Sequence, residues 1–254
     1  MRAMTVVLLH GNPETPIIWE PLVAELGRTD VVTPQLPGFG CAVPDGFGST
    51  KEEYVDWFAD VIEPLVAQHG PVDFVGHDWG GAIGMRLVSQ RPALFRTWAC
   101  DVLGLFHPDY VWHDFAQIWQ KSPDGEAHFQ QSLATPAADR VALYEMIGIP
   151  RAIGERLVAV ADEQMAASVL ALYRSATQPA MAAWGAELGP AGTLPGLAIT
   201  APGDPFVSGE DLGVEVATRL GATRHVMEGQ GHWWMLGDPA GGAAALRSFW
   251  AAAY

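Results

Sequence analysis

The segment that most constrains the fold of this chain is residues 72–90, where an apolar strand meets a helix across a glycine-rich turn. Residues 72–76 have the pattern of a short buried strand, and the residues after the turn have the pattern of a helix. Asp78 stands at the tip of a Gly-X-Asp-X-Gly turn, and Gly76 and Gly80 flank it where a β-carbon would clash. This geometry predicts an Asp78 side chain raised above the end of a sheet.

A carboxylate in that position can attack carbon and form an ester on the enzyme. The alternative is an ordinary strand-to-helix turn in which Asp78 caps the helix. The position of His232 favours the interpretation of Asp78 as a nucleophile. His232 lies in a glycine-framed loop before the last helix, and an imidazole can activate water near neutral pH. We interpret the other seven of the eight histidines as structural or surface groups: His10, His69, His77, His107, His113, His128 and His225.

Two aspartates compete for the place beside His232. Asp204 follows the predicted strand 197–200, and a carboxylate there would hold the imidazole in one tautomer and offset its charge. Asp101 lies just past the strand that follows the elbow. We favour Asp204 and keep Asp101 as the alternative acid.

The hydrophobic pattern alternates between strands and helices, which indicates a parallel sheet covered on both faces. Strands are predicted at 5–9, 31–34, 72–76, 97–102, 197–200 and 223–227, and helices at 19–26, 51–69, 212–220 and 240–253. Pro64 should kink the second helix or end it. The alternation stops over 105–186, where aromatic-rich helical segments predict an inserted lid between core segments 1–104 and 187–254. A helical core piece with no contact to the site is the alternative.

Composition narrows the class of protein. The 14 basic and 29 acidic residues give a net charge of −15, which disfavours nucleic acid and anionic membranes as partners. No run of about 18 apolar residues suggests a membrane span, and we expect no signal peptide of the usual form. The two cysteines, Cys41 and Cys100, have no metal or redox spacing, so we expect free thiols, no metal site and a cytoplasmic location.

The order Asp78, Asp204, His232, with an early His-Gly pair, resembles the α/β-hydrolase superfamily over nearly the whole chain. The segment Gly-His-Asp-Trp-Gly-Gly around Asp78 is similar to the branch with an aspartate nucleophile, which includes haloalkane dehalogenases and epoxide hydrolases. The resemblance implies an ester on Asp78, hydrolysed by water that His232 deprotonates, with no metal or organic cofactor. The main-chain N–H groups of Asn12 and Trp79 would form the oxyanion hole.

Residue 12 favours the dehalogenases within this branch. They typically have His-Gly-Asn-Pro, as here, and the resemblance implies that the Asn12 amide and the Trp79 indole hold the departing halide. Tyr173, however, resembles a lid tyrosine with which epoxide hydrolases protonate the opening ring, and Glu14 matches their early loop. Epoxide hydrolysis is therefore the alternative, and a non-catalytic ligand receptor on this fold is a remote one. The substrate and lid candidates are Tyr173, Tyr144 or Tyr110 as a second tyrosine, Phe39 and Trp112.

One feature departs from the superfamily pattern. Two antiparallel strands usually precede the His-Gly strand, whereas here His-Gly begins at residue 10. Either the hairpin is missing or the start is a late one. We expect about six strands, with a sheet edge that is exposed or covered by a partner, and a homodimer would provide such a cover. The expected ligands are a small, neutral, apolar organic substrate and water.

Overall fold

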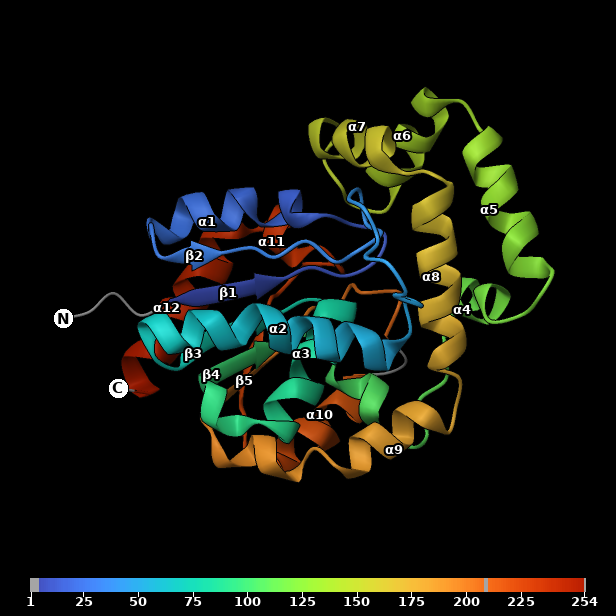
Figure 1. Ribbon diagram of the computed structural model, residues 1–254. Coiled ribbons are helices and arrows are strands. Elements are labelled where there is room, and N and C mark those ends of the chain that lie inside the picture. The colour runs from blue at the N-terminus through green and yellow to red at the C-terminus, as the bar shows by residue number, and fades with distance from the viewer. Residues whose placement is uncertain (1–4, 208–209, 254) are drawn as a thin grey trace.

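The computed structural model describes residues 5–207 and 210–253. Its six strands form one parallel sheet in the order β2-β1-β3-β4-β5-β6 (Figure 1). The strands are β1 Val6–Leu9, β2 Val31–Val32, β3 Val72–Gly76, β4 Phe95–Cys100, β5 Gly196–Thr200 and β6 Thr223–Val226. The predicted parallel sheet of six strands is confirmed. Strand β4 lies two residues earlier than predicted, because Phe95 pairs with Val72 next to an irregularity in the register.

Helices cover both faces of the sheet. They are α1 Glu20–Leu26, α2 Lys51–His69, α3 Trp79–Gln90, α10 Glu210–Arg219, α11 Trp234–Gly237 and α12 Pro239–Ala253. In Figure 1, α1 and α12 lie on one side of the sheet, and α2 and α3 lie on the other. Strand β1 shows why both sides are apolar: Val6 and Leu8 join the cluster under α1 and α12, whereas Val7 and Leu9 join the cluster under α2 and α3.

Helix α2 starts at the predicted residue because Thr50 and Glu53 form a capping box. Pro64 lies inside the helix, which continues to His69, so the alternative of a boundary at Pro64 was wrong. The fully buried Phe58 and Ile62 anchor the turns on its N-terminal side to the core, which helps the helix to absorb the one hydrogen bond that a proline removes.

Six helices are inserted between β4 and β5. They are α4 Asp114–Trp119, α5 Asp124–Ala134, α6 Ala137–Met146, α7 Arg151–Val160, α8 Glu163–Ser175 and α9 Ala180–Ala186. Figure 1 shows α4–α8 beyond the end of the sheet to which the strand arrows point. Leu172 and Tyr173 of α8 join the cluster that lies under α2 and α3, so the insertion is anchored to the core. Over the described residues, none of the helices has the length and apolarity needed to span a membrane.

The backbone of the elbow is strained at Asp78. Asp78 has φ 49° and ψ −125°, in the left-handed half of the map that side chains other than glycine rarely adopt. A β-carbon on Gly80 would lie 2.1 Å from the carbonyl oxygen of Leu9 in the adjacent strand. The first turn of α3 can therefore pass the end of β1 only if residue 80 has no side chain.

We expect Gly80→Ala to lower the free energy of unfolding by about 1–3 kcal/mol or more, because the clash is with backbone that has no alternative rotamer. Chemical denaturation measures this loss. Gly189→Ala is the matched control, since a β-carbon there meets nothing within 4 Å. Equal stabilities of the two variants would contradict the close approach of α3 to β1.

Candidate active site

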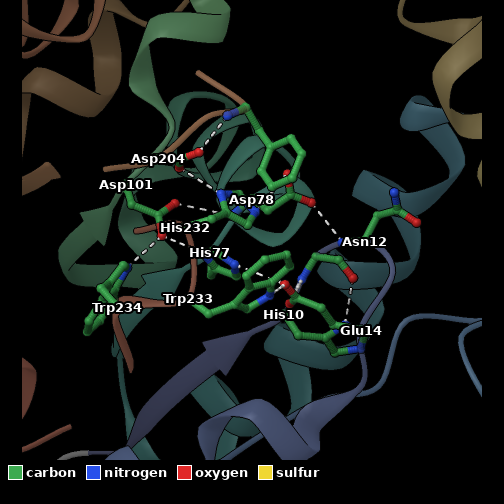
Figure 2. Close-up of polar contacts among 12 residues, drawn as sticks. His10, Asn12, Glu14, His77, Asp78, Asp101, Asp204, His232, Trp233 and Trp234 are labelled. Atoms are coloured by element: carbon green, nitrogen blue, oxygen red, sulfur yellow. Dashed lines mark hydrogen bonds and ion pairs between the residues drawn. The ribbon is translucent and has the colours of Figure 1, made fainter. Parts of the chain in front are cut away.

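The Asp78 carboxylate lies at the carboxyl end of the sheet, beside the loop that follows β1 (Figure 2). The main-chain N–H of Asn12 donates to its Oδ1 at 2.7 Å. A β-carbon on Gly11 would lie 2.2 Å from the same oxygen, so the glycine of the early His-Gly pair makes room for the carboxylate. The side chain of Asp78 is 18% exposed, which leaves part of the carboxylate open to a ligand.

His232 comes from the loop between β6 and α11 and faces Asp78. Its Nδ1 lies 2.7 Å from Oδ2 of Asp204, which is the arrangement in which the imidazole donates to the carboxylate. The other oxygen of Asp204 accepts the main-chain N–H of Phe206 at 2.8 Å. Nε2 lies 3.9 Å from Oδ2 of Asp78, too far for a direct hydrogen bond, so its lone pair is available to water.

Asp78, His232 and Asp204 each change the pKa of a neighbouring group. Burial raises the pKa of Asp78, and the nearby His232 only partly opposes that rise. Burial alone lowers the pKa of His232, but the Asp204 carboxylate outweighs burial and raises that pKa above its usual value. Burial also disfavours ionised Asp204, yet the facing imidazole lowers the pKa of Asp204 overall. The arrangement can hold a carboxylate nucleophile next to an imidazole base.

The hydrogen bonds of Asp101 go to groups other than His232. Its Oδ1 accepts the main-chain N–H of Asp78 at 3.1 Å, and its Oδ2 lies 2.5 Å from Nδ1 of His77. The indole N–H of Trp234 also donates to Oδ2, at 2.8 Å. The geometry therefore places Asp204 at the imidazole of His232 and Asp101 beneath the elbow, since the two carboxylates follow different strands.

Behind the elbow lies a buried charge network that the sequence reading missed (Figure 2). The side chain of His77 is fully buried, with Nδ1 at Asp101 and Nε2 3.0 Å from Oε1 of the equally buried Glu14. The indole N–H of Trp233 also donates to Glu14. Burial opposes a charge on His77, but the two carboxylates outweigh it and raise its pKa well above 6.5. His77 is thus an imidazolium between two carboxylates.

The hydrogen bonds of this network also bear on whether its side chains could bind a metal ion. Among the described residues, Glu14, His77 and His232 form a group whose ligand atoms all lie within 4.8 Å of one another. Both nitrogens of His77 are already hydrogen-bonded to carboxylates, however, and a protonated imidazole has no lone pair for a metal. The donor set therefore does not suit a cation, and we assign no metal to it.

A small cavity adjoins Asp78 and His232. The space open to the centre of a water molecule there is about 20 Å³, enough for about one water. Aromatic side chains make up much of its wall: Trp79, Tyr110, Trp112 and Phe206. Aliphatic side chains add to it: Val102, Leu105 and Val207. No lysine or arginine is among these lining residues, which favours a neutral ligand.

His113 also lines this cavity, so our interpretation of it as a structural or surface residue was incomplete. The sequence contained a weak signal for it, since it follows Trp112 in the aromatic-rich start of the insertion. Its Nδ1 accepts the main-chain N–H of Ala116 at 3.3 Å and caps α4. Residues of the insertion and of the core therefore share the wall of the cavity.

Tyr173 lies next to the two groups expected to hold a halide. Its hydroxyl is 3.4 Å from Nδ2 of Asn12, and it is also hydrogen-bonded by the side chain of Trp79. Burial, together with the charge of Asp78, raises the pKa of Tyr173 well above 10, so the phenol stays protonated near neutral pH. Three neutral hydrogen-bonding groups thus converge beside the carboxylate.

Three of the substrate and lid candidates do not line the cavity: Tyr173, which contacts Asn12 as described above, Phe39 and Tyr144. Phe39 is fully buried in the core, where its ring packs edge-on against Tyr54 at 6.2 Å. Tyr144 lies on α6 and packs against the apolar cluster that includes α1 and α12. Aromatic composition alone could not separate these packing roles from pocket roles, because the lengths and turns between the inserted helices decide which rings face inward.

The buried network predicts a pH dependence of stability. Burial opposes ionisation of Glu14, but His77, with smaller effects of His232 and His10, outweighs burial, and together they lower the pKa of Glu14 from 4.5 to about 2. A carboxylate with a depressed pKa contributes stability above pH 4.5 that is lost as the pH falls towards 2. Glu14→Gln should therefore flatten the fall in unfolding free energy over this window, by up to about 1.4 kcal/mol per pH unit.

At pH 7 the same variant should lose about 3–5 kcal/mol, because it leaves a buried imidazolium with one counter-charge fewer. Denaturant unfolding at several pH values measures both effects. Glu20→Gln is the control, since the Glu20–Arg156 ion pair is more than half exposed and should contribute little. A Glu14→Gln protein with the wild-type stability and pH profile would refute the charged network.

Comparisons with known proteins identify the family and the fold. Residues 6–245 match the model of the alpha/beta hydrolase family. A haloalkane dehalogenase of Psychrobacter cryohalolentis is 33% identical over 121 residues, which are 46% of this chain and 39% of the relative. One of Mesorhizobium japonicum is 27% identical over 177 residues, which are 63% of this chain and 50% of the relative. The matched segments thus span half or less of the length of these relatives.

A solved haloalkane dehalogenase of Bradyrhizobium elkani has the same fold. It superimposes with a TM-score of 0.72 at 20% identity and covers 98% of this chain and 92% of the other. The family match extends from the first strand into the last helix and includes the elbow, both candidate acids and the histidine. The chain belongs to the alpha/beta hydrolase family.

Proposed function

We propose that this protein is a hydrolase that uses Asp78 as its nucleophile and removes halide from haloalkanes. The observation that carries the proposal is the line of groups Asp78, His232 and Asp204. The imidazole is bonded to one carboxylate at 2.7 Å and faces the other at 3.9 Å. A serine-type nucleophile is absent from the elbow, so the reaction that fits is displacement at carbon by a carboxylate.

In the first step, an oxygen of Asp78 forms a bond to the carbon while the carbon–halogen bond breaks. The halide leaves with the electron pair, towards the amide of Asn12 and the indole of Trp79. Neutral N–H donors can stabilise a departing anion in a dry pocket. The neutral lining of the cavity supports a small apolar substrate, and so do the dehalogenase names of the relatives.

In the second step, His232 takes a proton from water as the water oxygen attacks the ester carbon of Asp78. The oxyanion would be held by the main-chain N–H of Asn12, which already donates to Oδ1 at 2.7 Å, and by that of Trp79. The alcohol then leaves, Asp78 is again a carboxylate, and one proton passes to solvent. Such a donor typically contributes roughly 3–4 kcal/mol.

The space in the cavity that is open to the centre of a water molecule is only about 20 Å³, so the cavity next to Asp78 is narrow. We infer that the inserted helices act as a lid that moves to admit the substrate, since Trp112 and His113 belong to the insertion and line the cavity.

Trapping the ester tests the nucleophile. We expect wild-type enzyme to release bromide from 1-bromobutane, and His232→Gln to accumulate a butyl ester on Asp78, because the base that hydrolyses it is missing. Intact-protein and peptide mass spectrometry detect the adduct, and a halide assay follows bromide. Asp204→Asn should slow turnover by about 10²–10⁴-fold.

Asp101→Asn is the comparison for that variant. Because Asp101 is hydrogen-bonded to the backbone of Asp78, whereas His232 is hydrogen-bonded to Asp204, we expect its loss to lower stability more than the rate of ester hydrolysis. If neither haloalkanes nor epoxides label Asp78, covalent catalysis on these substrates is wrong, and a ligand receptor becomes the better interpretation.

Epoxide hydrolysis is the second candidate, and the position of Tyr173 favours it. A halide leaves without a proton, whereas the alkoxide formed from an epoxide needs one, and the Tyr173 hydroxyl lies beside Asn12 and Trp79. A phenol with a raised pKa remains protonated and can supply that proton.

Tyr173→Phe separates the two candidates. If the natural reaction is dehalogenation, bromide release from 1-bromobutane should stay within about threefold of wild type, since no acid is needed. For an epoxide hydrolase, turnover of styrene oxide should fall about 10²-fold or more. Tyr110→Phe is the matched control, because its hydroxyl already donates to the carbonyl oxygen of Phe206. Wild-type enzyme active on styrene oxide alone would replace our first proposal with the second.

A further inference from the structure

The aromatic wall of the cavity offers few polar atoms to a substrate. The hydroxyl of Tyr110 donates to the carbonyl oxygen of Phe206 at 3.3 Å. The indole N–H of Trp112 donates to the carbonyl oxygen of Ala176 at 3.2 Å. The side chain of Trp79 is hydrogen-bonded to the hydroxyl of a tyrosine on α8. The polar groups of Tyr110 and Trp112 therefore already have main-chain partners, and the Trp79 indole is the group that the proposed reaction assigns to the departing halide.

His113 differs from the aromatic residues. Its Nδ1 accepts the N–H of Ala116, so a neutral imidazole must carry its proton on Nε2. Within residues 5–207 and 210–253, no group is hydrogen-bonded to Nε2 of His113, although the residue lines the cavity. Apart from Asp78 and His232, it is the lining side chain whose polar atom remains available.

The surroundings keep this donor neutral and fixed. Burial, with a smaller effect of His232, lowers the pKa of His113 to about 4, and Asp204 and Asp114 only partly oppose this. The ring packs edge-on against Phe206 at 5.3 Å. The imidazole is thus one tautomer in one orientation, which suits the recognition of a single acceptor atom.

We propose that His113 determines specificity by donating its Nε2–H to an oxygen of the substrate. The substrate class would then be an alkyl halide that also bears an oxygen acceptor, such as a carbonyl, rather than a plain haloalkane. This inference rests on the proposed function, because Asp78 must attack the same molecule. A buried donor favours a ligand that satisfies it over one that leaves it unpaired.

Two substitutions separate the two nitrogens of His113. Asn places its amide near the position of Nδ1, so His113→Asn keeps a good cap for α4 and loses the donor in the cavity. Gln reaches the position of Nε2, so His113→Gln keeps the donor there. The probes are 6-bromohexan-2-one against 1-bromohexane, and 5-bromopentan-2-one against 1-bromopentane.

We expect the wild type to have a higher kcat/KM for at least one ketone than for its matched alkane. His113→Asn should reduce that preference by about tenfold to one hundredfold, with the alkane rate little changed, and His113→Gln should retain most of it. Equal losses on ketone and alkane would overturn the proposal and indicate a role in positioning water or the lid. An unchanged preference in His113→Asn would overturn it as well.

Failure of the proposed function is detected separately. If the wild type turns over none of the four bromides, the unreactive hexan-2-one is titrated into protein labelled with ¹⁵N at histidine. A shift of the His113 Nε2 signal that is lost in His113→Asn, with other histidine signals unmoved, supports recognition of the carbonyl. No shift at millimolar ketone overturns it.

Discussion

The hydrogen bond from the main-chain N–H of Asp78 to Asp101 is the interaction on which the candidate site depends. The backbone of Asp78 lies at φ 49°, which costs about 1–3 kcal/mol in a residue other than glycine. A hydrogen bond to a charged acceptor contributes about 1.5–3 kcal/mol and can offset that cost. On its other oxygen, Asp101 pairs with His77, and Glu14 pairs with the opposite nitrogen of His77. The backbone of the elbow is therefore supported by a buried row of three interacting side chains: Asp101, His77 and Glu14.

Two carboxylates at the same edge of the sheet acquire different tasks from their strands. Asp101 follows β4, the neighbour of the elbow strand, and so reaches the backbone beneath Asp78. Asp204 follows β5, beside the strand that leads to His232, and so reaches the imidazole. A carboxylate beside an imidazole that stays protonated stabilises the fold. A carboxylate beside an imidazole that gains and loses its proton raises the pKa of that imidazole. This separation lets a buried charge support Asp78, the proposed nucleophile, without competing for His232, the proposed base.

The remaining polar groups near Asp78 are neutral donors set in aromatic walls. Tyr173 converges with the side chains of Asn12 and Trp79, and His113 approaches from the start of α4. Burial raises the pKa of Tyr173 and lowers that of His113, so both groups are uncharged near pH 7. A neutral donor can hold an oxygen or a halide without the desolvation cost of a buried ion. Burial thus keeps these hydrogen-bond donors of the inserted helices uncharged beside the core part of the site.

The sequence by itself determined the parallel sheet, the elbow and the likeness in order to known hydrolases, because these follow from local pattern: strand runs, glycines that admit no side chain, and capping residues such as Thr50. It also singled out Asp78, His232 and Asp204, since loops that follow neighbouring parallel strands meet at one edge. Only the tertiary structure gave Asp101 and Asp204 their different hydrogen-bond partners. Only the tertiary structure also placed His113 at the cavity and Phe39 in the core. These outcomes depend on how six inserted helices pack and on burial around charged side chains, which are properties of contacts far apart in the chain.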